Sequence, residues 1–210
     1  MAQYNTIADI RKSLNGGGAR PNLFEVDIPE NSLFKYVGSD SQLDSRVLVK
    51  AAQLPASNVA SIDVPFRGRI MKVAGDRTFD TWTVTVINDV DFNLRTAFQN
   101  WMQAIAQYAD GSGEADPQVY KSTATVTQLK RRSSNLGQTS DSGLEAAYTY
   151  DFFGIFPTNI SAIDLSYDTA DTIEEFTVEF QVDYWAPTFN KGGKSVTDNV
   201  DTTSQIQGTA

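Results

Sequence analysis

Cysteine and histidine, the two residue types that carry much of enzyme chemistry, are absent from this 210-residue chain. Without cysteine the chain has no disulfide bonds, no thiolate nucleophile and no cysteine-ligated metal. Without histidine it lacks the commonest general base, and Ser-His-Asp and Cys-His arrangements are excluded. The sequence therefore nominates no catalytic residues, no cofactor site and no metal site, and we expect a protein that is not an enzyme.

Long apolar runs are also missing. No stretch of 18 apolar residues exists, so we expect no membrane anchor. Residues 1–5 lack the basic start and apolar core of a signal peptide. A chain without cysteine fits synthesis in a reducing cytoplasm.

Positive charge is scarce. The chain has 26 acidic and 17 basic residues and a net charge of −9. Nucleic-acid binding needs Lys and Arg to displace counterions from phosphates, so this composition argues against a DNA-binding protein. It suits a surface past which DNA slides without being held.

What is present indicates a packed domain with many strands. Hydrophobic residues make up 40% of the chain and aromatic residues 11%. Trp82, Val84 and Val86 alternate with threonines, and the same period of two continues from Phe176 to Tyr184. Shorter strand patterns occur at 24–28, 46–51, 70–73, 122–129, 144–153 and 160–167. A turn at 168–171 is predicted to join 160–167 and 173–184 into a hairpin. We expect an α+β, mostly β fold, an antiparallel sandwich or barrel-like domain with one main helix.

The helix is indicated by one apolar stripe of Leu94, Phe98, Trp101 and Ile105. Asp89 or Asp91 is suited to cap its start, and 110–113 to end it. Together with the strand pattern, the stripe predicts that the core contains Trp82, Phe98, Trp101, Phe176 and Phe180.

The remaining segments contain turn-forming residues. Residues 52–68 contain two prolines and Gly68 and predict a long loop, and Gly75 with Asp76 predicts a tight turn. Gly16 to Gly18 form a hinge. The expected organisation is a flexible N-terminal arm at 1–18, one domain at 19–186, and a flexible polar C-terminal tail at 187–210.

Three groups of charged or aromatic residues each have a possible functional role and a purely structural explanation. An acidic cluster (Asp164, Asp168, Asp171, Glu174, Glu175) lacks the ligand spacing of a Ca²⁺ loop, so a solvated turn is favoured. Adjacent Glu174 and Glu175 point to opposite faces of a strand and cannot form a glycosidase pair. The basic run 130–132 is a solvated strand end, or it contacts nucleic acid or an acidic neighbouring subunit. Trp82, Trp101 and Trp185 pack in a core or, if exposed, bind sugars.

Five segments in order resemble the tail tube proteins of contractile-tailed bacteriophages. They span roughly residues 19–186, and the longest runs from Val73 through Trp82 to Asp89. The last ends in Tyr184 and Trp185. The segments are residues 19–26, 52–56, 73–89, 154–159 and 176–185.

This resemblance implies a structural subunit. Its sheets would join those of its neighbours into a homohexameric ring with a continuous inner β-barrel, and the rings would stack into a tube that passes DNA without binding it specifically. The implied partners are further copies of the chain, the tail sheath protein outside, and baseplate and tail-terminator proteins at the ends. The implied location is the virion tail, after synthesis in the host cytoplasm.

The same reading assigns roles to particular residues. The loop 52–68 suits contacts between stacked rings, with Leu54, Pro55, Val64, Pro65 and Phe66 as candidates. The polar faces of the two clearest strands suit the lumen, with Thr81, Thr83, Glu179 and Asp183 as candidates. The loop 131–143 and the tail receive no role.

Two alternatives remain. A tube subunit of a phage-tail-like injection or type VI secretion machine would look the same in sequence, and gene neighbourhood would separate the two. A β-sandwich carbohydrate-binding or adhesin module would instead be a monomer with exposed aromatic side chains.

Overall fold

The computed structural model of the chain describes residues 7, 9–10, 14, 18–35, 44–131, 144–168, 171–191 and 194–197. The chain divides into two compact units. One, called the core unit, comprises residues 26–125 and 151–186, and the second unit comprises residues 1–25, 126–150 and 187–210. Most of the predicted N-terminal arm, the loop 132–143 and the end of the tail from 198 lie outside the described residues.

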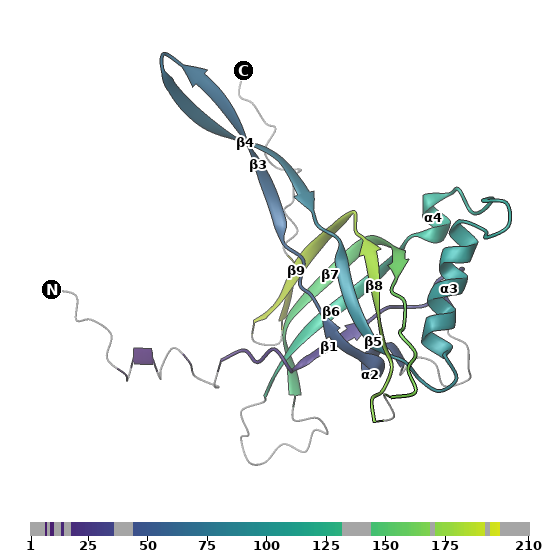
Figure 1. Cartoon of the computed structure of the whole chain (residues 1–210). Coiled ribbons are helices and arrows are strands. Elements are labelled where there is room, and N and C mark those ends of the chain that lie inside the picture. The colour runs from purple at the N-terminus through teal and green to yellow at the C-terminus, as the bar shows by residue number, and fades with distance from the viewer. Residues whose placement is uncertain are drawn as a thin grey trace. The chain divides into compact units, whose positions relative to one another are not determined.

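The described elements are mostly antiparallel strands, with one helix of more than three turns (Figure 1). This confirms the predicted fold class. The hydrogen-bonded strand order is β1-β6-β7-β8-β5-β2, with β9 on β7 and β10 on β9, and β3 pairs only with β4. The elements are β1 (Phe24–Asp27), α2 (Asp44–Leu48), β2 (Val49–Ala52), β3 (Ser57–Phe66), β4 (Arg69–Phe79), β5 (Trp82–Ile87), α3 (Asn93–Ile105), α4 (Pro117–Tyr120), β6 (Ser122–Arg131), β7 (Leu144–Ile160), β8 (Glu175–Gln181), β9 (Tyr184–Lys191) and β10 (Lys194–Thr197).

The core unit is organised by the pairing of β5 with β8. Trp82 lies opposite Phe180, Val84 opposite Val178 and Val86 opposite Phe176. Residues directly opposite each other in a sheet share a face, so these six form one apolar surface. All six are at most 1% exposed.

Helix α3 covers this surface with its apolar stripe. Phe98 and Trp101 contact the ring of Phe180 at centroid distances of 5.8 and 6.3 Å. Phe34 stacks on Phe98, and Phe152 stacks on Trp82 at 4.6 Å. The indole Nε1 of Trp101 donates a hydrogen bond to the carbonyl oxygen of Tyr120 at 2.8 Å, so its polar atom is satisfied inside the core.

The start of α3 differs from an ordinary capped end. Phe92 occupies the N-cap position in a left-handed conformation, with φ of 55°, and makes no side-chain cap. Asp89 serves instead: its carboxylate accepts hydrogen bonds from the backbone N and the side-chain Nδ2 of Asn93, at 3.0 and 2.9 Å. Asp89, one of the two predicted caps, therefore satisfies the first amide of the helix.

The second unit contains its own strand pairing. β10 pairs with β9 from Lys194 opposite Lys191 to Thr197 opposite Thr188. These strands occupy part of the segment 187–210, where the sequence predicts a tail without regular structure.

On β7, burial and the nearby Tyr148 raise the pKa of Tyr150, whose ring lies 4.6 Å from that of Tyr148.

Three local predictions were wrong. Residues 57–66 are not loop but strand β3, so the connection after β2 is only 53–56. Gly75 and Asp76 form no turn, because they lie inside β4, where Val59 pairs with Arg77 but Ser61 pairs with Ala74. The extra residue on β4 makes this a β-bulge. Gly and polar residues are suited to a bulge as they are to a turn, so the same sequence pattern fits both.

The third wrong prediction is the hairpin around 168–171. No described residue between Ile160 and Glu175 is in a strand. β8 pairs with the last part of β7, through Pro157 opposite Phe180 and Asn159 opposite Glu179. Residues 161–174 are therefore a connection at the sheet's end and not a continuation of it.

The buried aromatic residues give a stability test. We expect Trp101→Ala and Phe180→Ala each to lower the free energy of unfolding by about 3–5 kcal/mol, because both side chains are fully buried. Phe66→Ala is the control, since Phe66 is 66% exposed, and should change stability by less than about 0.5 kcal/mol. Urea denaturation followed by tryptophan fluorescence and circular dichroism measures all three; equal losses at Phe66 and Phe180 would contradict this account of the core.

Candidate self-assembly surface

The β3–β4 hairpin is a two-stranded sheet with no covering layer among the described residues. Every residue of β3 and nearly every residue of β4 is exposed. An isolated two-stranded hairpin is at best marginally stable in water. Its exposure therefore points to a covering surface on another molecule.

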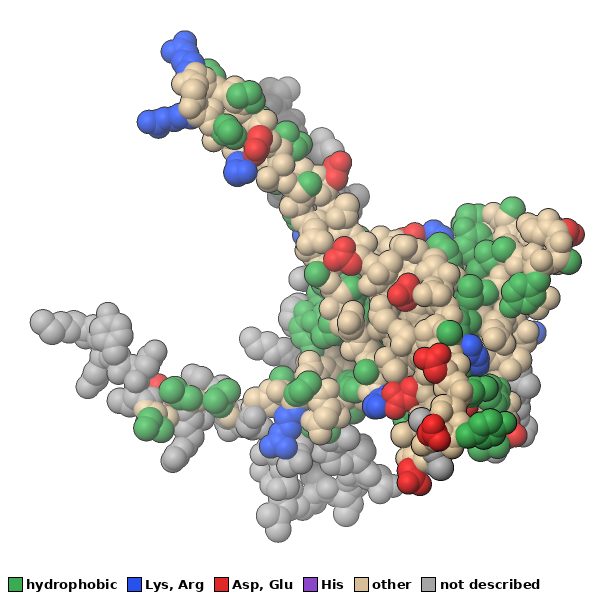
Figure 2. All heavy atoms as spheres, in the orientation of Figure 1, with side chains coloured by type: hydrophobic (Ala, Val, Ile, Leu, Met, Phe, Trp, Pro, Cys, Tyr) green, Lys and Arg blue, Asp and Glu red, His purple; other side chains and the backbone are tan. Residues whose placement is uncertain are grey.

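The register divides the hairpin into two unlike faces. Ile62 lies opposite Val73 and Val64 opposite Met71, and Phe66 follows on the same face. These five apolar residues, called the apolar face, are each 39–66% exposed. The other face carries Asp63, whose carboxylate accepts a hydrogen bond from Lys72 Nζ at 3.0 Å. Figure 2 shows hydrophobic side chains on the hairpin surface.

The turn of the hairpin is basic. Arg67 and Gly68 both have positive φ, 46° and 80°, as a two-residue hairpin turn of matching twist requires. The Arg67 guanidinium lies over the Phe66 ring, 5.3 Å from its centroid. Within the described residues neither Arg67 nor Arg69 has a carboxylate partner. Residues 57–79 carry four basic and two acidic side chains in a chain of net charge −9.

The candidate inter-ring residues fall in two places. Val64, Pro65 and Phe66 lie at the end of β3 and are exposed. Leu54, 45% exposed, and Pro55 lie in the short connection before β3. The sequence analysis did not single out Ile62, Met71 and Val73 of the apolar face, nor Arg67 and Arg69 of the turn. The alternation of Ile62, Val64 and Phe66 is the pattern that indicates a strand here.

The candidate lumen residues separate into two pairs. Thr83 on β5 lies opposite Glu179 on β8, and Asn159 on β7 lies on the other side of Glu179. These side chains are on the face of the sheet opposite the buried one, in one polar row. Thr81 precedes β5 and Asp183 follows β8, so neither belongs to this row.

Asp183 is instead part of a local ion pair. Lys121 Nζ donates to its carboxylate at 2.7 and 2.8 Å. Gly154 sits beside this carboxylate with φ of 66°, and a Cβ added there would overlap Asp183. The absence of a side chain at Gly154 makes room for the pair.

Other predicted groups are placed as follows. Trp82 and Trp101 are buried, and Trp185 is half-buried with Phe79 against its ring edge at 6.0 Å. Lys130 and Arg131 end β6, and Arg132 lies outside the described residues. Among residues that the structure describes, no three acidic side chains are grouped to hold a metal ion. No described helix is both long and apolar enough to cross a membrane.

Comparison with known proteins identifies the family. A family model described as phage tail tube protein matches residues 19–188. The tail tube protein gp19 of Enterobacteria phage T4 is 33% identical over 180 residues, covering 85% of this chain and 98% of gp19. The tail tube protein of Serratia phage KSP90 is 23% identical and covers 84% of this chain. The chain belongs to the phage tail tube protein family, a structural family, and its location is the virion tail.

Solved structures agree at the level of fold. The tube terminating cap of the anti-feeding prophage superposes with a TM-score of 0.56 at 16% identity, covering 82% of this chain and 92% of that one. A chain of the sheath-tube complex of an extracellular contractile injection system gives 0.53 at 15% identity, covering 89% and 100%. The fold is therefore shared by tails and by contractile injection systems.

The Gly154 site gives a second test. Gly154→Ala should cost about 1–3 kcal/mol of stability beyond Gly111→Ala, because both glycines have similar positive φ but only Gly154 has a neighbour in the way. The difference in urea midpoint between the two variants isolates the overlap with Asp183. Equal costs would show that Asp183 and Lys121 move aside freely.

Proposed function

We propose that the chain forms homohexameric rings that stack into a hollow tube, through which DNA leaves the capsid. The observation that carries the stacking is the hairpin of a tail tube family member, whose apolar face has no cover among the residues that the structure describes. Burial of such a face against another subunit is favourable at roughly 25 cal/mol per Å² of apolar surface. The subunit acts as a passive conduit, and no bond is made or broken.

Ring closure is supported by the sheet. Among the described strands, the order of the main sheet ends at β1 and β2, and edge strands of this kind can pair with another chain. Head-to-tail pairing between identical subunits closes a ring when the rotation between them divides a full turn. In our proposal, inter-subunit strand pairing builds the inner barrel.

The partners follow from this assembly. The sheath lies outside the tube and drives it through the host envelope on contraction, and baseplate and terminator proteins bind the tube's ends. The structures with a similar fold include a tube terminating cap and a chain of a sheath-tube complex, which supports this arrangement.

The injection-machine alternative keeps one specific observation in its favour. The fold matches tube and cap chains of contractile injection systems, although at 15–16% identity. The 33% identity to a phage tube protein favours the virion. The tryptophans do not support the carbohydrate-binding alternative, because Trp82 and Trp101 are buried and Trp185 is half-buried.

The stacking proposal is tested by shortening the hairpin in register. Ser61 lies opposite Ala74, so residues 62–73 are removed and the ends joined by Asn-Gly, which favours a tight hairpin turn. We expect a folded, soluble protein whose circular dichroism still shows a β-rich domain but which forms no long tubes. Negative-stain microscopy of the parent and the variant measures this, and normal tubes from the shortened protein would refute stacking through the hairpin.

The lumen is tested at Glu179, which we propose lines the channel with Thr83. An acidic wall repels phosphates, so Glu179→Lys should leave assembly intact and slow DNA release, most of all at low ionic strength where attraction is least screened. Single-particle ejection assays at two salt concentrations provide the measurement. Asp183→Lys is unsuitable as a partner substitution, because it would place a second cation beside Lys121. Release at the parental rate in low salt would place Glu179 away from the channel.

A further inference from the structure

A second unusual surface lies in the connection between β7 and β8. Leu165, Tyr167 and Ile173 are 80%, 107% and 73% exposed. Asp164, Asp168 and Asp171 accompany them, and none has an ion-pair partner in the part of the chain that the structure describes. We call these six residues the acidic surface. An exposed group of large apolar side chains rimmed by like charges is typical of a protein interaction site.

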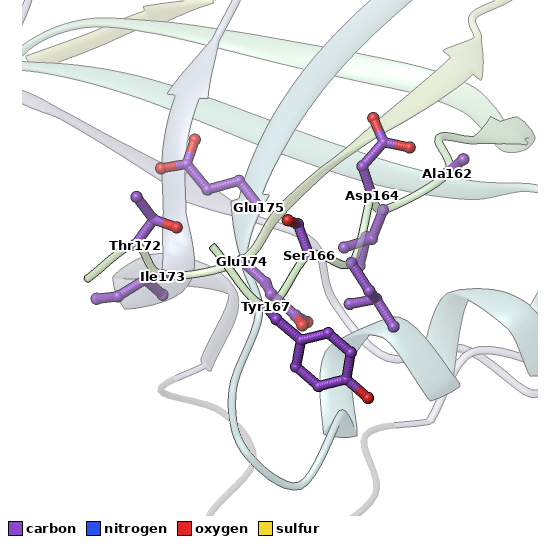
Figure 3. A pocket seen from close by; sticks show the side chains of 10 residues that line it. Ala162, Asp164, Ser166, Tyr167, Thr172, Ile173, Glu174 and Glu175 are labelled. Carbon is purple, nitrogen blue, oxygen red and sulfur yellow. The ribbon is translucent and has the colours of Figure 1, made fainter. Parts of the chain in front are cut away.

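The acidic surface has a formed hollow and an anchored edge. Four of its residues, Asp164, Leu165, Tyr167 and Ile173, help to line a hollow of about 670 Å³ (Figure 3). Glu174, at the edge, is held by Asn88, whose backbone N and side-chain Nδ2 donate to its carbonyl and carboxylate oxygens at 2.9 and 3.0 Å. In Figure 3 the Asp164 carboxylate and the Tyr167 ring point to opposite sides of the segment, so the surface offers both charge and apolar area.

The hairpin and the acidic surface join the sheet at opposite ends of one strand. β4 ends at Phe79, shortly before Trp82 begins β5. Asn88, which holds Glu174, directly follows Ile87 at the other end of β5. Any contact between the hairpin of one copy and the acidic surface of another therefore joins unlike ends of two subunits. Such head-to-tail contacts extend without limit when they do not close on themselves.

The two surfaces are complementary in chemistry. The hairpin turn presents Arg67 and Arg69 beside an apolar face, and the acidic surface presents aspartates beside apolar side chains. Guanidinium groups suit carboxylates in particular, since their planar fork matches the two oxygens.

We propose that the acidic surface is the receptor for the hairpin turn of a second copy of this chain in the next ring. This inference rests on the proposed stacking function and names the surface that receives the hairpin. Arg67 and Arg69 meet the aspartates of the acidic surface, and Phe66 and its neighbours cover Leu165, Tyr167 and Ile173. The contact fixes the direction of stacking, because two hairpins repel each other and so do two acidic surfaces.

Charge exchange tests this pairing. Arg67→Glu with Arg69→Glu, and separately Asp164→Arg with Asp168→Arg, should each raise the critical concentration for tube formation by at least about tenfold, since like charges then meet across the contact. The protein carrying all four substitutions should recover tubes, because the charges attract again with reversed sign. Sedimentation and negative-stain microscopy of purified protein measure tube formation, and circular dichroism confirms that each variant is folded.

The matched control for the arginine variant is Arg20→Glu with Lys35→Glu, which changes the net charge by the same amount but lies outside both surfaces. It should assemble like the parent. Normal tubes from the Asp164 and Asp168 variant, or no recovery in the combined protein, would overturn the pairing. If the hairpin-shortened protein also forms tubes, the stacking proposal itself fails; if only the acidic-surface variants assemble normally, the hairpin docks elsewhere and stacking stands.

Discussion

The pairing register between β5 and β8 is the constraint on which the rest of the structure depends. It places Trp82 against Phe180 and Val86 against Phe176 on one face, where α3 packs. A slip of one residue would turn every one of these side chains to the opposite face. The same register puts Thr83 beside Glu179 on the polar face and leaves the hairpin and the acidic surface at the two ends of β5.

Much of this core could be predicted from the sequence. The alternation around Val84 and Val178 and the stripe containing Phe98 both follow from burial of one face, and that pattern is local. The Asp89 contact with Asn93 was likewise accessible, because capping acts within one turn. The order of strands in the sheet was not accessible, since it depends on pairings between segments far apart in the chain.

The candidate assembly surface was only partly predictable. Pro55, Pro65 and Gly68 favour a loop, and a pattern of alternating Ile62, Val64 and Phe66 ordinarily means a face buried in the same molecule. The hairpin breaks that expectation because its apolar face is exposed in the subunit. The register also shows why the shortened hairpin must lose residues from both strands: removal of β3 alone would leave β4 without its pairing strand.

The division between a self-sufficient core and an uncovered hairpin has an energetic consequence. The core unit buries its large aromatic residues without help, so the subunit is able to fold before it assembles. In the proposed assembly the hairpin gains its cover from another subunit, and its apolar area then contributes to association instead of to folding. The net charge of −9 keeps free subunits apart, and the basic turn locally reverses that repulsion. If the proposal holds, folding and stacking depend on different residues, and we expect a change in Arg67 or Asp164 to alter assembly without disturbing Trp82 or Trp101.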